Sequence, residues 1–262
     1  MDEQIVEHIR RYGVYRDSGE ARLKALAGDI GVRLDQRARY VVIGGCLIPE
    51  LIPGAVGAFK QVLELLRIDY TFLSKEYCCG WIPLGQPAVM AKNEEGIARS
   101  KELSRGLIRE NLRQAEDLGA EAVVLFCAAC EPNYSNCEDL TELEILPYAQ
   151  LLDRHFGGAT LEREVDYYAG CYRFRRRIAE RPLDVEAGLR VLRRIRGLKL
   201  NELDNRLCCY VPSHLERLTG SLKTEQLVTA CTGCYGNLGR TLQSGSRRVS
   251  MLPELVLEAL QR

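Results

Sequence analysis

The sequence is poor in histidine, and its opposite charges cancel. It has three histidines among 262 residues, and its 36 Lys and Arg balance its 36 Asp and Glu. None of the histidines, His8, His155 and His214, has metal-ligand spacing to another histidine or to a Cys-x-x-Cys motif. A chain without net charge has no long-range attraction for nucleic acid or for an anionic membrane. The sequence therefore predicts neither a histidine metal site nor a nucleic-acid-binding protein.

Long uninterrupted apolar runs are also missing. The most apolar window, residues 40–59, has the length of a membrane span but contains Glu50, Pro49, Pro53 and four glycines. Such a window is typical of a strand, a turn and a helix, so no membrane span is expected. The amino terminus, residues 1–4, lacks the basic and apolar segments of a secretory signal. We therefore expect a cytoplasmic protein whose thiols stay reduced and available as ligands.

Cysteine, by contrast, is abundant and ordered. Ten of the eleven cysteines form two copies of one pattern, a single Cys, an adjacent pair and a Cys-x-x-Cys, and only Cys137 is left over. The copies are Cys46, Cys78, Cys79, Cys127 and Cys130, and then Cys171, Cys208, Cys209, Cys231 and Cys234. Zinc is satisfied by four ligands, so five thiols from three separate places in each half indicate a larger metal centre.

The repeat extends beyond cysteine. Residues 40–46 correspond to residues 165–171, and both are short β-prone runs that end in small residues before a single Cys. Residues 123–127 likewise correspond to 227–231, and residues 145–148 to 250–253. Agreement at these places favours an internal duplication.

Helical periodicity separates the β-prone runs. It covers residues 51–66, 98–118, 185–195 and 214–227. Strands that alternate with helices predict an α/β fold of two tandem, pseudo-symmetric units with parallel sheets, over residues 39–160 and 161–262. The carboxyl ends of parallel strands share one edge of a sheet, so the thiols of each half are expected to converge there.

Residues 1–38 lie outside the repeat and predict a helical amino-terminal extension. Their apolar positions fit two short helices, with Ile5, Ile9 and Tyr12 on the first and Leu23, Leu26 and Ile30 on the second. The extension could cap the edge of the first sheet or dock a partner. We favour the cap.

The cysteine pattern resembles the tandem cysteine-rich CCG-domain proteins of the heterodisulfide reductase B-like family, from residue 39 to the carboxyl terminus. The resemblance implies that each set of five cysteines holds a noncubane 4Fe-4S cluster, so two such clusters are the expected cofactors. The second copy departs from the pattern, because Tyr210 follows Cys209 where Gly80 follows Cys79. Glycine there allows a positive φ and a close approach of its amide to sulfur. Tyr210 is therefore expected to alter the turn, the hydrogen bonding or the access, although all five thiols are present.

The paired sites predict a redox function. A disulfide needs two electrons, whereas iron-sulfur clusters change by one, so two clusters suit the cleavage or formation of a small-molecule disulfide between them. The sequence has no closely spaced cysteines for a cubane cluster and no glycine-rich nucleotide fingerprint. Electrons are therefore expected from partner subunits, for which the resemblance suggests a ferredoxin-like iron-sulfur subunit and a flavin-containing subunit.

Two other functions stay open. The chain could be an electron-transfer subunit of an oxidoreductase for lactate, glycolate, succinate or sulfur compounds, which clusters sealed by Trp81 or Tyr210 would favour. It could also be a zinc-binding assembly module, although zinc would leave one cysteine idle in each half. Near the second set, His214 could donate a proton to a departing thiolate. The four arginines among residues 173–177 could grip an anionic substrate or form a solvated face.

Overall fold

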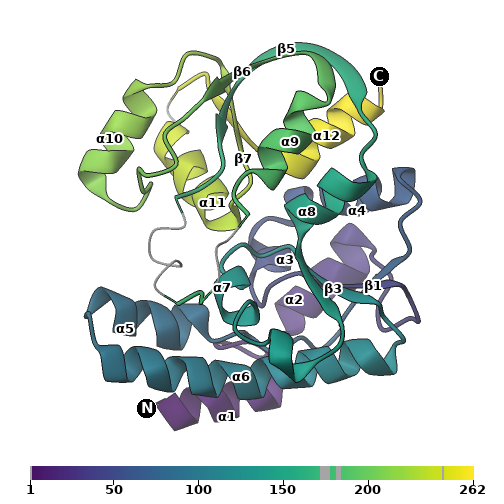
Figure 1. Cartoon of the computed structure of the whole chain (residues 1–262), viewed down its shortest axis with the longest axis vertical. Coiled ribbons are helices and arrows are strands. Elements are labelled where there is room, and N and C mark those ends of the chain that lie inside the picture. The colour runs from purple at the N-terminus through teal and green to yellow at the C-terminus, as the bar shows by residue number, and fades with distance from the viewer. Residues whose placement is uncertain (1, 172–177, 181–183, 244) are drawn as a thin grey trace. The chain divides into compact units, whose positions relative to one another are not determined.

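The structure, a computed structural model, consists of two α/β units. It describes residues 2–171, 178–180, 184–243 and 245–262, so Arg173, Arg175, Arg176 and Arg177 lie outside the described residues. The first unit comprises residues 1–57, 68–147 and 174–183, and the second comprises residues 58–67, 148–173 and 184–262. Each unit is built around its own sheet (Figure 1).

The sheet of the first unit has four parallel strands in the order β2-β1-β3-β4. The strands are β1 (Tyr40–Ile43), β2 (Tyr70–Phe72), β3 (Ala122–Leu125) and β4 (Glu144–Pro147). All residues of β1, β2 and β3 are buried, as expected of parallel strands that are covered on both faces. The two runs that carry cysteines at their ends, β1 and β3, are neighbours in the sheet.

Helices connect these strands. They are α3 (Ile48–Leu51), α4 (Pro53–Leu65), the π-helix η2 (Trp81–Gly85), α5 (Gln86–Met90), α6 (Glu94–Asp117), α7 (Glu131–Tyr134) and the 3₁₀ helix η3 (Glu138–Leu140). Asn93 caps α6 by accepting a hydrogen bond from the Gly96 amide at 3.0 Å. Ile108 and Leu112 of α6 are buried with Val41 and Val123 of the sheet, so α6 covers one face.

The sheet of the second unit repeats this topology in the order β6-β5-β7-β8, again fully parallel. Its strands are β5 (Ala159–Tyr168), β6 (Ile195–Glu202), β7 (Gln226–Thr229) and β8 (Arg248–Met251). Its helices are α8 (Tyr148–His155), α9 (Ala187–Arg193), α10 (Pro212–Gly220), α11 (Thr232–Leu242) and α12 (Leu252–Leu260). The predicted fold class is confirmed, and the equal strand order agrees with the internal duplication.

Two details of the prediction were wrong. The strands β2 and β6 were not predicted, and the helix predicted over residues 214–227 ends at Gly220. Asp166 on β5 accepts hydrogen bonds from the backbone amides of Lys223 and Thr224, at 3.0 Å each, and so turns the chain out of the helix and toward β7. Apolar spacing continues through this turn, which is why periodicity alone extended the helix.

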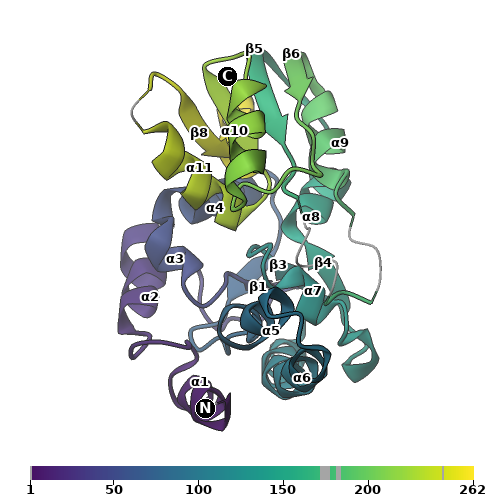
Figure 2. The ribbon, with the colours of Figure 1, turned by 90° about the vertical axis from the view of Figure 1, so that its left-hand side faces the viewer.

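The amino-terminal extension caps the first sheet, as favoured from the sequence. It contains α1 (Asp2–Tyr12), α2 (Glu20–Lys24) and the π-helix η1 (Ala25–Ile30). Leu34 forms a parallel bridge with Phe72 at the outer edge of β2, and the Phe72 amide donates to the Arg33 carbonyl at 2.9 Å. Figure 2 shows α1 running beside α6. The extension therefore satisfies backbone groups that the edge strand would otherwise expose.

A buried ion pair anchors this extension. Arg22 of α2 donates to the Glu76 carboxylate at 2.9 Å and to the Ser74 carbonyl at 2.9 Å, and both charged side chains are almost fully buried. The Gly45 amide also donates to the Glu76 carboxylate, at 3.0 Å. Burial raises the pKa of Glu76, and the Arg22 charge acts against this shift. One buried carboxylate thus joins the extension to the loops that lead to Cys46 and Cys78.

Arg22→Met is expected to lower the free energy of unfolding by about 3–5 kcal/mol, because it leaves a buried carboxyl group without its charge partner. Urea unfolding followed by circular dichroism measures this change. Arg113→Met is the matched control, since it removes an exposed pair with Glu110 and should cost less than about 0.5 kcal/mol. Equal effects of the two substitutions would contradict a stabilising role for the buried pair.

Candidate metal centres

Two neighbouring strands bring the outer members of the first cysteine set together. Cys46 follows β1 by three residues and Cys127 follows β3 by two. Gly45 has a φ of +93°, and a Cβ atom placed there would lie 2.7 Å from the Cβ of Cys127. Only glycine therefore lets the loop after β1 approach Cys127 so closely.

The five thiols of the first set, Cys46, Cys78, Cys79, Cys127 and Cys130, form a continuous group. The sulfur atoms of Cys46 and Cys78 lie 3.3 Å apart. Further hydrogen-bond contacts join Cys78 to Cys79, Cys79 to Cys130, and Cys130 to Cys127. Four of these side chains are buried and Cys46 is partly exposed. The structure thus brings together all five residues that the sequence assigned to the first site.

Cys79 is the thiol of this group whose pKa is lowered. Hydrogen bonds from Cys130 and then Cys78 lower the pKa of Cys79 well below its usual value, and the Trp81 amide and the Asn133 side chain add to this effect. The pKa of Cys78 is raised by its hydrogen bonds with Cys46 and Cys79, and by burial. Metal ligands must be thiolates, so Cys79 is the member of the set best prepared to bind.

Gly80 makes the turn after the first cysteine pair. It has a φ of +78°, and its amide donates to the sulfur of Cys78 at 3.5 Å. A Cβ atom at this position would lie 2.9 Å from the hydroxyl oxygen of Ser104. The positive φ and the amide-to-sulfur contact expected from the sequence are both present.

The amino-terminal extension contributes to the first set, which the sequence did not predict. The Cys78 amide donates to the carbonyl of Gly13 at 2.7 Å, and Cys78 is buried with Val6 and Ile9 of α1. Tyr15 packs against the same cluster. No motif marks residues 13–15, and a positive φ at Gly13, +80°, becomes evident only in the folded chain. The amino-terminal extension therefore also packs directly against the first cysteine set.

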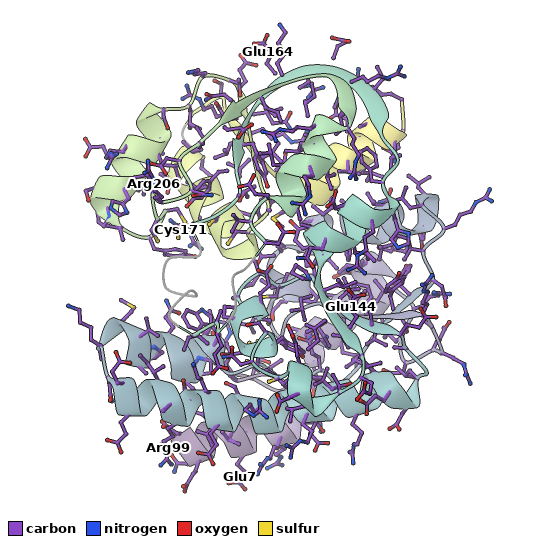
Figure 3. The ribbon with its side chains drawn as sticks, in the orientation of Figure 1. Glu7, Arg99, Glu144, Glu164, Cys171 and Arg206 are labelled. Atoms are coloured by element: carbon purple, nitrogen blue, oxygen red, sulfur yellow. The ribbon has the colours of Figure 1, made fainter. Side chains whose placement is uncertain are left out.

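The second cysteine set is Cys171, Cys208, Cys209, Cys231 and Cys234, and all five side chains are buried. Cys171, labelled in Figure 3, follows β5 by three residues and Cys231 follows β7 by two, the same offsets as in the first set. The sulfur atoms of Cys209 and Cys234 lie 3.5 Å apart. Hydrogen-bond contacts also join Cys171 to Cys208 and Cys231 to Cys234. The second set therefore gathers as the first does.

A tyrosine hydroxyl distinguishes the second set. Tyr168 ends β5, where the first copy has Ile43, and its hydroxyl donates to the Leu207 carbonyl at 2.5 Å. Burial raises the pKa of Tyr168, and nearby thiols of the set, Cys234 first among them, add to the shift. Tyr168 therefore remains a protonated donor that holds the chain just before the Cys208-Cys209 pair. Comparison of the two copies residue by residue would have singled it out.

Tyr210 changes the second turn but keeps the hydrogen bond to sulfur. Tyr210 does not have a positive φ, unlike Gly80, yet its amide still hydrogen-bonds to Cys208 and counteracts the rise in the Cys208 pKa that Cys171 and burial cause. Its hydroxyl donates to the Gly233 carbonyl at 3.1 Å, and 58% of the residue is exposed. The ring therefore crosses the loop between Cys231 and Cys234.

The remaining candidate residues, His214, Trp81 and Cys137, pack or form hydrogen bonds around the cysteine sets. The Nδ1 atom of His214 accepts a hydrogen bond from the Cys208 amide at 3.1 Å, so this nitrogen carries no proton to donate there. Trp81 is buried in the core of the first unit with Cys79. Cys137 donates to the Asn133 carbonyl at 3.2 Å, and burial raises its pKa to about 12. Cys137 therefore remains a buried thiol outside both sets.

The comparisons with known proteins agree with the geometry of the first set. The family model of the CCG cysteine-rich domain matches residues 40–133, which contain Cys46, Cys78, Cys79, Cys127 and Cys130. Residues 40–133 are therefore similar to the CCG cysteine-rich domain. This domain is found in heterodisulfide reductase B-like proteins, so the resemblance seen in the sequence is confirmed for residues 40–133.

The other comparisons add little about the CCG domain. No curated protein matches the chain. Among solved structures, the chain is similar to an aspartate racemase homologue from Pyrococcus horikoshii OT3, at 12% identity over 87% of this chain and 97% of that one. The TM-score is 0.35, too low to support any inference. The CCG domain and the clustered cysteines indicate an iron-sulfur or other metal-binding role, consistent with an oxidoreductase-associated subunit.

The donor chemistry of both sets fits an iron-sulfur centre. Each set offers five sulfurs and needs no oxygen or nitrogen ligand, as is typical of clusters held by thiolates. Across the described residues, no group of three or more His, Cys, Asp or Glu side chains is arranged to hold a single metal ion. In the same part of the chain, no helix is long and apolar enough to cross a membrane.

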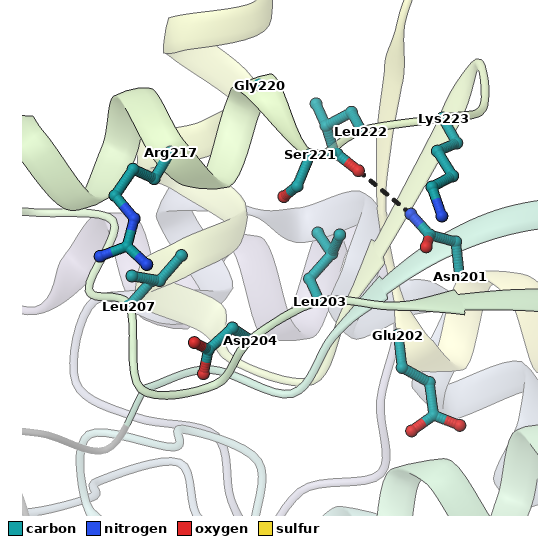
Figure 4. Close-up of a pocket in the computed structure, with 10 residues that line it drawn as sticks. All are labelled: Asn201, Glu202, Leu203, Asp204, Leu207, Arg217, Gly220, Ser221, Leu222 and Lys223. Atoms are coloured by element: carbon teal, nitrogen blue, oxygen red, sulfur yellow. Dashed lines mark hydrogen bonds between the residues drawn. The ribbon is translucent and has the colours of Figure 1, made fainter.

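A separate pocket in the second unit lies beside the strand β6. It has a volume of about 350 Å³ and is bordered by Asn201, whose side chain donates to the Ser221 carbonyl at 3.2 Å (Figure 4). Arg217 and Asp204 bring opposite charges to its wall, and no cysteine lines it. The pocket therefore has no single charge preference and is not part of the thiol site.

Gly80→Ala is expected to destabilise the first unit by about 1–2 kcal/mol through its left-handed backbone alone, with a further cost from the contact with Ser104. It should also lower the iron content of the protein. Gly106→Ala is the matched control, because Gly106 lies within α6 and no atom is within 4 Å of a Cβ placed there. That control should gain up to about 1 kcal/mol. Urea unfolding and iron analysis would refute the role of Gly80 if both variants behaved alike.

Proposed function

We propose that the chain is the iron-sulfur catalytic subunit of a cytoplasmic disulfide reductase, with one noncubane 4Fe-4S cluster on each set of five thiols. The observation that carries this proposal is the equivalence of the two sets. Each gathers a single Cys, an adjacent pair and a Cys-x-x-Cys after equivalent strands of two sheets with the same order. The family match of residues 40–133 supports it independently.

The chain's own residues would prepare the sites for this chemistry. Burial of nine of the ten thiols excludes water, and the hydrogen bonds that lower the pKa of Cys79 favour its thiolate form, the form that binds metal. Amides of Gly80 and Tyr210 donate to Cys78 and Cys208, and hydrogen bonds to ligand sulfur adjust the potential of an iron-sulfur site. When bound, two one-electron clusters would supply the two electrons that a disulfide requires.

Electrons would reach this protein from partners. The sequence has neither a cubane-cluster motif nor a dinucleotide fingerprint, which is the reason to infer separate carriers. We assign these roles to a ferredoxin-like iron-sulfur subunit and a flavin-containing subunit. The substrate would be a small-molecule disulfide, or the corresponding thiols in the reverse direction.

A second function, electron transfer within a different oxidoreductase, is favoured by one observation. Tyr210 crosses the Cys231–Cys234 loop through its hydrogen bond to Gly233, and all five thiols of that set are buried. A covered set suits outer-sphere electron transfer better than direct contact with a substrate sulfur. The two functions predict different responses to disulfides.

Anaerobic purification with metal analysis tests the cofactor proposal first. The proposal predicts a brown protein with about eight irons per chain, the number in two four-iron clusters. Zinc in place of iron would support the assembly module and overturn the redox function. Electron paramagnetic resonance is then recorded with and without cystine, oxidised glutathione and their thiols. A disulfide reductase should respond to a disulfide or thiol, whereas unchanged spectra and a copurifying dehydrogenase would establish the electron-transfer role.

Single Cys→Ser variants should localise the clusters. Cys79→Ser and Cys209→Ser are each expected to remove about half of the bound iron, because each breaks one of two separate five-thiol sets. Cys137→Ser is the matched control, since Cys137 is a buried thiol outside both sets and should leave the iron content unchanged. Full iron retention in the first two variants would show that these cysteines are not ligands.

A further inference from the structure

Two asparagines occupy equivalent places in the two copies. Asn133 lies three residues after Cys130, and Asn237 lies three residues after Cys234. The side-chain amide of Asn133 donates to the Cys79 carbonyl at 2.7 Å, and that of Asn237 donates to the Cys209 carbonyl, also at 2.7 Å. Each hydrogen bond therefore ties the second cysteine of the adjacent pair to the segment that follows the Cys-x-x-Cys.

The connecting chain does not dictate this hydrogen bond. The bonded residues are 54 positions apart in the first copy and 28 apart in the second, because the second copy has a shorter connection between the pair and the Cys-x-x-Cys. The helical contexts also differ, since Asn133 lies in the four-residue α7 and Asn237 in the eleven-residue α11. An identical contact across different connections indicates a requirement of the thiol sets themselves.

Asn133 has additional contacts that hold it in place. It is 3% exposed, and its amide also lies 3.2 Å from the hydroxyl oxygen of Ser104. The same side chain also hydrogen-bonds to the thiol of Cys79. Asn133 therefore contacts both the backbone and the sulfur of one candidate ligand.

We propose that Asn133 and Asn237 are positioning residues that hold Cys79 and Cys209 in register with the Cys-x-x-Cys motifs, so that each thiol set is assembled before a cofactor binds. The role of these residues in cluster assembly rests on the proposed function. Their effect on the thiols of the metal-free chain is independent of that function.

Asn133→Asp tests the proposal because it keeps the size of the side chain but replaces the amide donor by an oxygen that repels the Cys79 carbonyl. In the metal-free, reduced full-length chain, alkylation of Cys78 and Cys79 by N-ethylmaleimide should accelerate about fivefold, the change that loss of one hydrogen bond gives in an opening equilibrium. Cys208 and Cys209 should keep their wild-type rates. Mass spectrometry of the labelled peptides measures each rate separately.

Asn237→Asp should produce the mirror result, with faster labelling of Cys208 and Cys209 only. It also keeps the proposal testable if Asn133→Asp does not fold. Asn136→Asp is the matched control, because Asn136 is a buried asparagine of the first unit whose side-chain amide donates to the Ile178 carbonyl at 2.8 Å and not to a cysteine of the adjacent pair. A general loss of stability would affect the control as much as Asn133→Asp.

Iron-loaded protein supplies the second readout. Each Asp variant should bind about half the iron of the wild type, and any cluster that it keeps in the altered set should show a shifted midpoint potential. If both Asp variants label and bind iron as Asn136→Asp does, the positioning role is overturned. If the wild type binds no iron but labelling still changes set by set, the proposed function fails and the positioning role stands.

Discussion

The arrangement of both sites depends on parallel pairing of two neighbouring strands. Because β1 pairs in parallel with β3, and β5 with β7, the chain leaves both strands of each pair at the same sheet edge. Cysteines two or three residues beyond those strand ends must then meet there. An antiparallel pairing would separate them by the length of a strand. The remaining thiols need only be brought to an edge whose position the sheet already determines.

Buried polar contacts complete this arrangement in the first unit. The Glu76 carboxylate accepts from Arg22 and from the Gly45 amide, so it connects the cap, the loop before Cys46 and the segment before Cys78. The Gly13 carbonyl accepts a hydrogen bond from the Cys78 amide and so also ties the cap to this segment. Polar groups in such a low-dielectric setting are costly when unpaired, which makes the connected arrangement specific as well as stable. The cap and the first thiol set therefore form one structural unit.

Much of this could be predicted from the sequence, and the failures have physical causes. The strands β1 and β3 were found because β-branched residues and cysteines coincide there, and the fold class followed from the alternation of strands and helices. The strand β2 has only three residues, and β6 has one buried residue among exposed and partly buried ones, so neither gives a distinct apolar signal. The backbone contact of Gly13 and the side-chain contacts of Asn133 and Tyr168 depend on direction and distance in three dimensions, which residue spacing does not encode.

Tyr210 shows that the two copies can differ at the turn that follows the adjacent cysteine pair. The amide at this position donates to sulfur whether or not the side chain is hydrogen, whereas the turn at Gly80 leaves no room for a Cβ atom. The first half therefore requires glycine at position 80. The equivalent position in the second half, which does not have a positive φ, carries the large aromatic side chain of Tyr210. A search that requires glycine after the cysteine pair would therefore miss the second copy. The backbone amide of Tyr210 nevertheless donates to Cys208 as the amide of Gly80 donates to Cys78.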